Sequence, residues 1–212
     1  SEILDQILFA GLDCGERVSH VVLMGTGEPL DNYDNVRKFL TLVGTDGGLN
    51  IGARNISLST CGLCDQIDRL ADEKLQITLS VSLHAPNDTL RQQIMPIARK
   101  YPMEWLLRSC ARYFEVTGRR VSYEYIMIRG FNDTPACAEE LAERLRGQNA
   151  HVNLIRLNNI AESPLRPSLP ESVREFQRVL TERGITATVR RRLGDDISAA
   201  CGQLRREQIN RL

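Results

Sequence analysis

The chain has 212 residues, of which 42% are hydrophobic, and its 27 basic side chains equal its 27 acidic ones in number. This composition excludes a disordered chain and predicts one domain, with at most a small appendage, large enough to fold without disulfides. No apolar run approaches the roughly 20 residues of a membrane-spanning helix, and no secretory signal opens the chain, so we expect a cytoplasmic protein without a membrane partner.

The neutral net charge argues at first sight against nucleic-acid binding, which usually needs a basic surplus. The charge is unevenly distributed, however, because residues 1–106 carry a net charge of −5 and residues 107–212 a net charge of +5. The basic residues comprise 24 arginines and only 3 lysines. Arginine binds phosphate well, but a compositional bias of the source genome would give the same count, so both interpretations stay open.

Helical and strand patterns alternate along the chain. An apolar helical pattern at Ile3, Leu4, Ile7 and Leu8 begins at once, so we expect that something precedes it. Strand patterns occupy residues 20–30, 55–62, 75–85, 120–130, 151–159 and 185–192. Helical patterns lie between or beside them at residues 35–43, 64–74, 88–97, 104–117, 136–146 and 171–183. About six strands separated by helices predict a parallel α/β sheet, but the pattern does not tell an open sheet from a closed barrel.

Polar or glycine-rich loops follow each predicted strand. These loops contain residues 25–28, 59–62, 82–84, 129–133, 158–159 and 194–196. Loops are polar in most proteins, so none of them alone indicates a function. Because the carboxyl ends of parallel strands meet at one edge of a sheet, six such loops together favour a functional site there.

Two of these loops contain candidate binding residues. Residues 25–30 read GTGEPL, in which the glycines allow a ligand close to the backbone and Glu28 can bind an ammonium group. The stretch is not a dinucleotide-binding motif, and a simple tight turn is the alternative. His84 ends a strand on the same face as Ser82, although a lone histidine is more often structural than catalytic.

The six cysteines favour thiol or metal chemistry over disulfides in a cytosolic protein. Cys61 and Cys64 form a C-x-x-C pair, but no second pair completes a zinc site, and we interpret the spacing as accidental. Cys201 differs, because it lies in GDDISAACGQL between arginines at residues 190–192 and 205–206. Nearby positive charge favours a nucleophilic thiolate, which makes Cys201 a candidate catalytic residue.

Six stretches of the chain, taken in order, carry a family resemblance: HVVLMGTGEPLDNYDNV, ISLSTCGL, ITLSVSLHAPND, LRQQIMPI, FND and GDDISAACGQLR. Together they resemble the radical S-adenosylmethionine (SAM) methyltransferases that methylate carbon 2 of an adenosine in 23S rRNA and in some tRNAs. The last stretch is highly specific, and the resemblance covers nearly the whole chain. It implies that residues 1–212 are a truncated catalytic domain, folded as a partial (β/α) barrel of mainly parallel strands without the first strand.

The resemblance also implies functional residues. Gly27 and Glu28 match the segment that holds the amino group of SAM, and Cys201 matches a cysteine that is itself methylated. The full set of SAM contacts that it implies is Gly27, Glu28, Ser59, Ser82, Leu83, His84 and Asn158.

The chemistry implied by the resemblance uses two SAM molecules. In the family, one SAM methylates the cysteine, and a second is cleaved by an electron from a [4Fe–4S] cluster. The resulting radical removes a hydrogen from the methylthioether, and the carbon radical then adds to the adenine. The resemblance therefore implies SAM and the cluster as cofactors, with 23S rRNA, tRNA and an electron donor as partners.

Several elements of the family pattern are absent from this sequence. It contains neither the C-x-x-x-C-x-x-C spacing that holds the cluster, nor the second cysteine with its neighbouring glutamate, nor the RNA-binding domain at the amino terminus. We therefore expect the cluster only in an intact protein, no activity from this chain alone, and an exposed apolar sheet edge. A relative that methylates carbon 8 and confers antibiotic resistance, or a cluster-free module that binds SAM or RNA, remains an alternative.

Overall fold

A computed structural model describes residues 2–158 and 164–190 of the chain. These residues form one parallel sheet of six strands in the order β1-β2-β3-β4-β5-β6, so that every strand pairs with its neighbour in sequence. The strands are β1 (Val21–Leu23), β2 (Ile56–Thr60), β3 (Thr78–Ser82), β4 (Val121–Met127), β5 (Ala150–Arg156) and β6 (Thr186–Val189). The predicted α/β class and strand number are confirmed.

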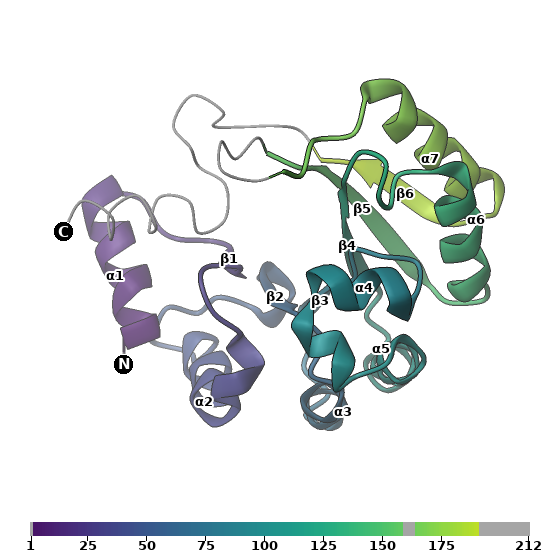
Figure 1. Cartoon of the computed structure of the whole chain (residues 1–212). Coiled ribbons are helices and arrows are strands. Elements are labelled where there is room, and N and C mark those ends of the chain that lie inside the picture. The colour runs from purple at the N-terminus through teal and green to yellow at the C-terminus, as the bar shows by residue number, and fades with distance from the viewer. Residues whose placement is uncertain (1, 159–163, 191–212) are drawn as a thin grey trace.

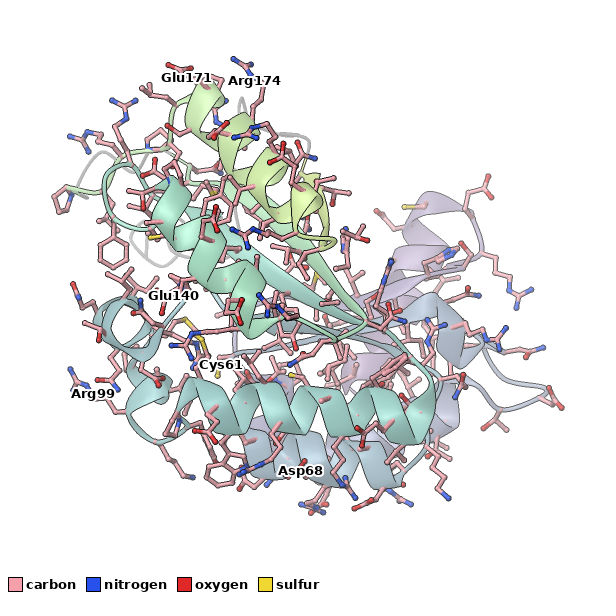
Figure 2. The ribbon with its side chains drawn as sticks, turned by 90° about the vertical axis from the view of Figure 1, so that its right-hand side faces the viewer. Cys61, Asp68, Arg99, Glu140, Glu171 and Arg174 are labelled. Atoms are coloured by element: carbon pink, nitrogen blue, oxygen red, sulfur yellow. The ribbon has the colours of Figure 1, made fainter. Side chains whose placement is uncertain are left out.

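Helices connect the strands and cover one side of the sheet. They are α1 (Glu2–Cys14), α2 (Tyr33–Val43), α3 (Cys64–Asp72), α4 (Asp88–Ile94), α5 (Met103–Thr117), α6 (Pro135–Arg144) and α7 (Pro170–Glu182), with short 3₁₀ turns η1 (Pro29–Asn32), η2 (Ala53–Asn55) and η3 (Pro96–Arg99). Among the described residues, no helix is long and apolar enough to cross a membrane. Figure 2 shows side chains such as Glu171 and Arg174 projecting outward from α7.

The single helix predicted over residues 88–97 is wrong. The structure divides this stretch into α4 and η3 at Met95, whose backbone is extended with φ −128° and ψ 92°. Pro96 explains the break, because proline lacks an N–H donor and disfavours a helical conformation of the residue before it.

The sheet is curved and open. Figure 1 shows helices α2, α3, α5, α6 and α7 on the outer side of the curve, as in a partial barrel. In the described part of the chain, β1 and β6 are the edge strands of the sheet, and β1 pairs only with β2. Val22 on β1 is 64% exposed, and its pairing with Ser57 places it on the face of the sheet away from the helices. The predicted exposed edge stays a prediction.

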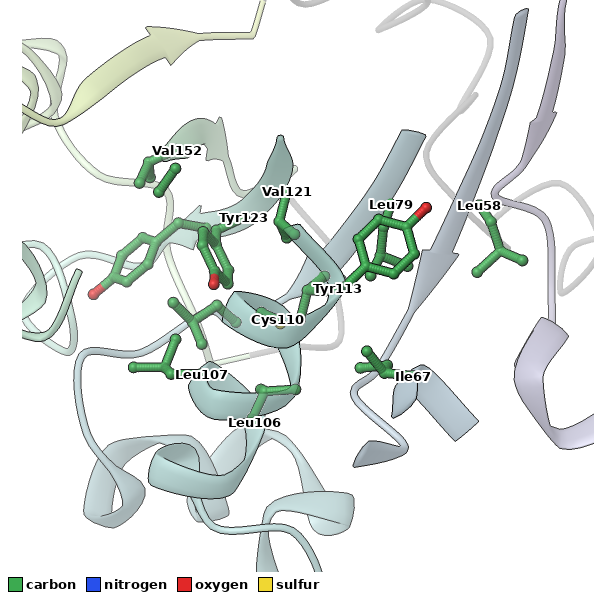
Figure 3. Packing of buried hydrophobic residues seen from close by; sticks show 14 of the residues in the cluster. Leu58, Ile67, Leu79, Leu106, Leu107, Cys110, Tyr113, Val121, Tyr123 and Val152 are labelled. Carbon is green, nitrogen blue, oxygen red and sulfur yellow. The ribbon is translucent and has the colours of Figure 1, made fainter. Parts of the chain in front are cut away.

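The hydrophobic core lies between the sheet and the helices. Successive side chains of a strand point to opposite faces, and Leu58, Leu79 and Tyr123 on the helix side are fully buried. Figure 3 shows Cys110 and Tyr113 of α5 packed in the same cluster. This layer fixes the strands, and hence the loops at their carboxyl ends.

Candidate ligand-binding site at the carboxyl ends of the strands

The inner face of the sheet is lined mostly by polar side chains. Alternation along the strands places on this face the polar residues Ser57, Ser59, Thr78, Ser80, Ser82, Ser122, Glu124, His151, Asn153, Thr186 and Thr188, and the apolar residues Val22, Ile126 and Ile155. In closed (β/α)₈ barrels the equivalent positions are filled mainly by branched apolar residues, which pack as a core. A polar inner face is instead suited to water and to a polar ligand.

Glu28, after β1, connects two neighbouring loops. Its Oε1 accepts a hydrogen bond from the Leu30 N–H (3.0 Å), and its Oε2 accepts one from the Cys61 N–H (2.6 Å). A carboxylate has about four acceptor positions, so capacity for a ligand ammonium group remains. Gly27 has φ 112°, and a Cβ atom at Gly25 or Gly27 would meet no atom within 4 Å. This loop is therefore open to a ligand as well as held in place.

The loop after β2 contains the C-x-x-C pair. Ser59 lies on the inner face beside Ser80 of β3. Burial and the neighbouring Glu28 raise the pKa of the Cys61 thiol to about 12, and burial raises the pKa of Cys64 to about 12. Both thiols are therefore protonated at neutral pH. No group of three or more His, Cys, Asp or Glu side chains among the described residues is arranged to hold a metal ion.

The three predicted residues at the carboxyl end of β3, Ser82 to His84, have different environments. Ser82 lies on the inner face, whereas the Leu83 side chain is fully buried in the core. The Leu83 N–H donates to the Glu124 carbonyl (3.0 Å), and its carbonyl accepts from Arg91 (3.2 Å). The contact of Leu83 with SAM stays a prediction.

His84 is held in one tautomer. Its Nδ1 accepts a hydrogen bond from the Ile126 N–H (3.1 Å), which places the proton of the neutral ring on Nε2. Burial, assisted by the Arg91 guanidinium, lowers the pKa of His84 to about 4. His84 is therefore neutral at physiological pH and joins the ends of β3 and β4, which agrees with a structural role.

Arg91 of α4 is a site residue that sequence reasoning missed. It is fully buried and donates to the carbonyl oxygens of Cys61 (2.8 Å), Ser82 (3.2 Å) and Leu83 (3.2 Å). The side chain thus holds the carboxyl ends of β2 and β3 together. Burial lowers its pKa.

Asn132 makes the corresponding connection between β3 and β4. This fully buried amide donates to the carbonyls of His84 (2.8 Å) and Ile126 (2.7 Å), and its Oδ1 accepts from the Ile128 N–H (2.8 Å). The sequence predicted Asn132 in one of the polar loops that follow a strand, and the FND stretch is also part of the family resemblance. Its backbone bonds show that it shapes the edge on which the candidate residues lie.

The predicted binding residues in the described part of the chain gather at one edge of the sheet. Gly27, Glu28, Ser59 and the Ser82–His84 group belong to the carboxyl ends of β1, β2 and β3 or the loops that follow. Asn158 is partly exposed and follows the end of β5 by two residues. Cys201 lies outside the described residues, so its role stays a prediction.

Comparison with protein families and curated proteins gives consistent matches. The model of the family "Radical SAM superfamily" matches residues 2–145. A protein of Alkaliphilus oremlandii is 52% identical over 208 residues, covering 98% of this chain and 61% of the relative. One of Desulforudis audaxviator is 53% identical over 205 residues, covering 97% and 64%. Both are named "Probable dual-specificity RNA methyltransferase RlmN", and the chain spans about three fifths of their length.

Solved structures match as well. The crystal structure of a radical SAM methyltransferase from Sphaerobacter thermophilus has a TM-score of 0.88 and 46% identity, covering 95% of this chain and 59% of that one. A domain of the pyruvate-formate lyase-activating enzyme from Bacteroides vulgatus has a TM-score of 0.63. Its identity is 19% with 82% of this chain and all of that chain covered, so it supports the fold alone.

Proposed function

The chain belongs to the radical SAM superfamily, and on that premise we propose that it is part of a cytoplasmic RNA methyltransferase. The proposed reaction methylates carbon 2 of an adenosine in 23S rRNA, and tRNA is the second proposed substrate. The observation that carries this proposal is the gathering of residues from the resemblance at one edge of a sheet with a polar inner face. The naming of relatives as dual-specificity RNA methyltransferases supports RNA as the substrate class.

The described residues fit SAM chemically. Glu28 has acceptor capacity for the ammonium group, and the open space at Gly25 and Gly27 lets a ligand approach the backbone. Ser59 and Ser82 add hydroxyl groups on the inner face. When bound, SAM supplies the methyl group and, in this superfamily, the radical.

A [4Fe–4S] cluster does not fit the described residues. Cys61 and Cys64 are protonated thiols, and the described part of the chain contains no set of side chains arranged for a metal. We therefore place the cluster, and the electron donor that reduces it, in the intact protein only. This chain alone is expected to be inactive, with Cys201 as the methyl carrier of the intact enzyme.

The test uses the intact gene product expressed in cells that lack the corresponding methylation. Cys201→Ala should abolish the methyladenosine found by mass spectrometry of nucleosides from 23S rRNA, while binding of SAM to the purified protein persists. Cys137→Ala, at a partly exposed cysteine of α6, is the matched control and should retain methylation.

Each possible result separates the candidate functions. Methylated RNA from the Cys201→Ala protein would refute the role of Cys201. A product with 8-methyladenosine would favour the carbon-8 relative, and SAM or RNA binding without any methylated product would favour a non-catalytic module.

A further inference from the structure

Two neighbouring arginines lie at the amino end of β4, at the opposite end of the strands from the candidate ligand-binding site. Arg119 and Arg120 directly precede Val121, the first residue of β4. The Arg119 Nη2 donates a hydrogen bond to the Thr78 hydroxyl at the start of β3 (3.0 Å). Arg120 precedes Ser122 by two residues, so the alternation of the strand directs its exposed side chain toward the inner face. Both arginines therefore border the inner face at its amino end.

His151 of β5 lies beside these arginines. It pairs with Ser122 in the sheet, and its Nδ1 lies 3.2 Å from the Ser122 hydroxyl. Its Nε2 lies 2.9 Å from the Thr188 hydroxyl of β6. Burial and the neighbouring Arg120 lower the pKa of His151. The ring is thus held between two neutral hydroxyl groups and close to a cation, and we call Arg119, Arg120 and His151 the basic cluster.

Acidic residues are scarce around the basic cluster. The sequence has no Asp or Glu in residues 74–87, 116–123 or 144–158, which contain β3, the start of β4 and the whole of β5. Glu124, further along β4, accepts a hydrogen bond from Asn153. None of the ion pairs among the described residues includes either arginine of the cluster, whereas arginines on α5, α6 and α7 pair with carboxylates. The positive charge of the cluster is therefore not neutralised by a described ion pair.

Arg119 also has an unused hydrogen-bond donor. Its Nε is buried and has no hydrogen-bond partner among the described residues. A buried polar group without a partner is unfavourable, so such a donor in a folded protein calls for a group that binds there. Like charges held close together also repel one another, and a bound anion relieves both unfavourable effects. The basic cluster therefore has the properties of an anion-binding site.

We propose that Arg119, Arg120 and His151 bind a phosphate group at the amino end of the sheet. A guanidinium has five N–H donors and binds phosphate through two of them in parallel, so Arg119 keeps donors after its bond to Thr78. A tetrahedral phosphate presents oxygen atoms on several sides, which suits donors that come from two strands. The site lies away from the carboxyl ends of the strands, so the inference goes beyond the proposed function and does not depend on it.

The first measurement is an NMR titration of the chain, labelled with ¹³C-histidine, with inorganic phosphate against NaCl of equal ionic strength. The ring signals of His151, assigned by their loss in His151→Gln, should shift saturably, whereas those of His20 and His84 should not. Phosphate should also raise the pKa of His151, because a nearby negative charge favours the imidazolium form. Arg120 and Glu124 also lie on the inner face near His151, but they are present with and without phosphate.

Variants test whether the arginines hold the anion. Arg119→Gln combined with Arg120→Gln should weaken phosphate binding about tenfold or more, because both charged donors are lost. Arg108→Gln combined with Arg174→Gln removes the same charge from exposed positions on α5 and α7 and is the matched control (Figure 2). Thermal unfolding checks that each variant is folded. Arg120→Gln alone should also weaken binding, and it keeps the bond between Arg119 and Thr78.

A second arm identifies the source of the phosphate group. Displacement of phosphate from His151 by a short RNA oligonucleotide, with weaker RNA binding by the Arg119→Gln/Arg120→Gln protein than by the control, assigns the site to the RNA backbone. A shift by phosphate or adenosine 5′-monophosphate that RNA does not reverse assigns it to a small phosphorylated molecule. No saturable shift of His151, or equal phosphate binding by the two double variants, would overturn the phosphate site and leave the proposed methyltransferase function standing.

Discussion

The two faces of the sheet are built from alternate residues of the same strands but differ in chemistry. On β2, Leu58 points into the helix layer and is fully buried, whereas its neighbour Ser57 points to the inner face. The same division separates Tyr123 from Glu124 on β4. Burial of apolar area is the dominant favourable contribution to folding, so the outer face of the sheet, which packs against the helices, provides most of the stability. Because the polar inner face contributes less to the apolar core, its side chains are available to bind a ligand.

The carboxyl ends of the strands, where the candidate binding residues lie, are held together differently from the core. There, side chains bind backbone groups of neighbouring loops, as Glu28, Arg91 and Asn132 do. Each joins two successive strands or the loops after them. The loops at the carboxyl ends of the strands are therefore held in place by polar interactions, whereas the core between the sheet and the helices is apolar.

The largest predicted effect tests the outer face. Leu58→Ala should lower the free energy of unfolding by about 2–5 kcal/mol, because it removes buried apolar contacts and leaves a cavity. Ser57→Ala, on the adjacent residue of the inner face, should change it by less than about 1 kcal/mol. Urea unfolding of both variants measures the difference. Equal losses would contradict the division of labour between the faces.

The next prediction concerns the carboxyl ends of β3 and β4, where His84 should make the stability of the protein depend on pH. The pKa of His84 in the folded state is about 4, below its ordinary value of 6.5. The unfolded chain therefore binds a proton more readily, and the contribution of His84 is fully present above pH 6.5 and lost as the pH falls toward 4. This loss should be on the order of 3 kcal/mol when complete.

The matched variant for this measurement is His84→Asn. His84 has φ 61°, a left-handed conformation that asparagine adopts more readily than most residues. Urea unfolding at pH 7.5 and 4.5 should show a larger loss of stability on acidification for the wild type than for the variant. Glu124 and the other titrating groups are common to both proteins, so an identical loss would show that His84 does not titrate as expected.

Much of this architecture could be predicted from the sequence, because periodicity and the polar residues at strand ends are local signals. They correctly indicated six strands and the edge at which the candidate residues meet. The stretch 20–30 was predicted as a strand that runs into a glycine-rich turn, and β1 accordingly ends at Leu23 before the glycines.

The connections at the site edge could not be predicted in the same way. Arginine is rarely buried, so nothing local to Arg91 indicates that it binds three carbonyls from two loops. Likewise, the hydrogen bond from Asn153 to Glu124 depends on the register of strands 29 residues apart. Such pairings arise from the tertiary fold and not from sequence periodicity.

The smallest predicted effect concerns the solvent side of the helix layer. Arg178 of α7 forms ion pairs with Glu175 and Glu182, and these carboxylates raise its pKa. All three side chains are largely exposed, so water and salt screen their attraction. Arg178→Met should therefore leave the urea midpoint unchanged in 1 M NaCl and lower it only slightly at low salt, whereas Arg178→Lys should retain the low-salt value. A large loss that persists in 1 M NaCl would mean that exposed charges contribute to stability as the apolar layer does, which would contradict the assignment of stability to the buried outer face of the sheet.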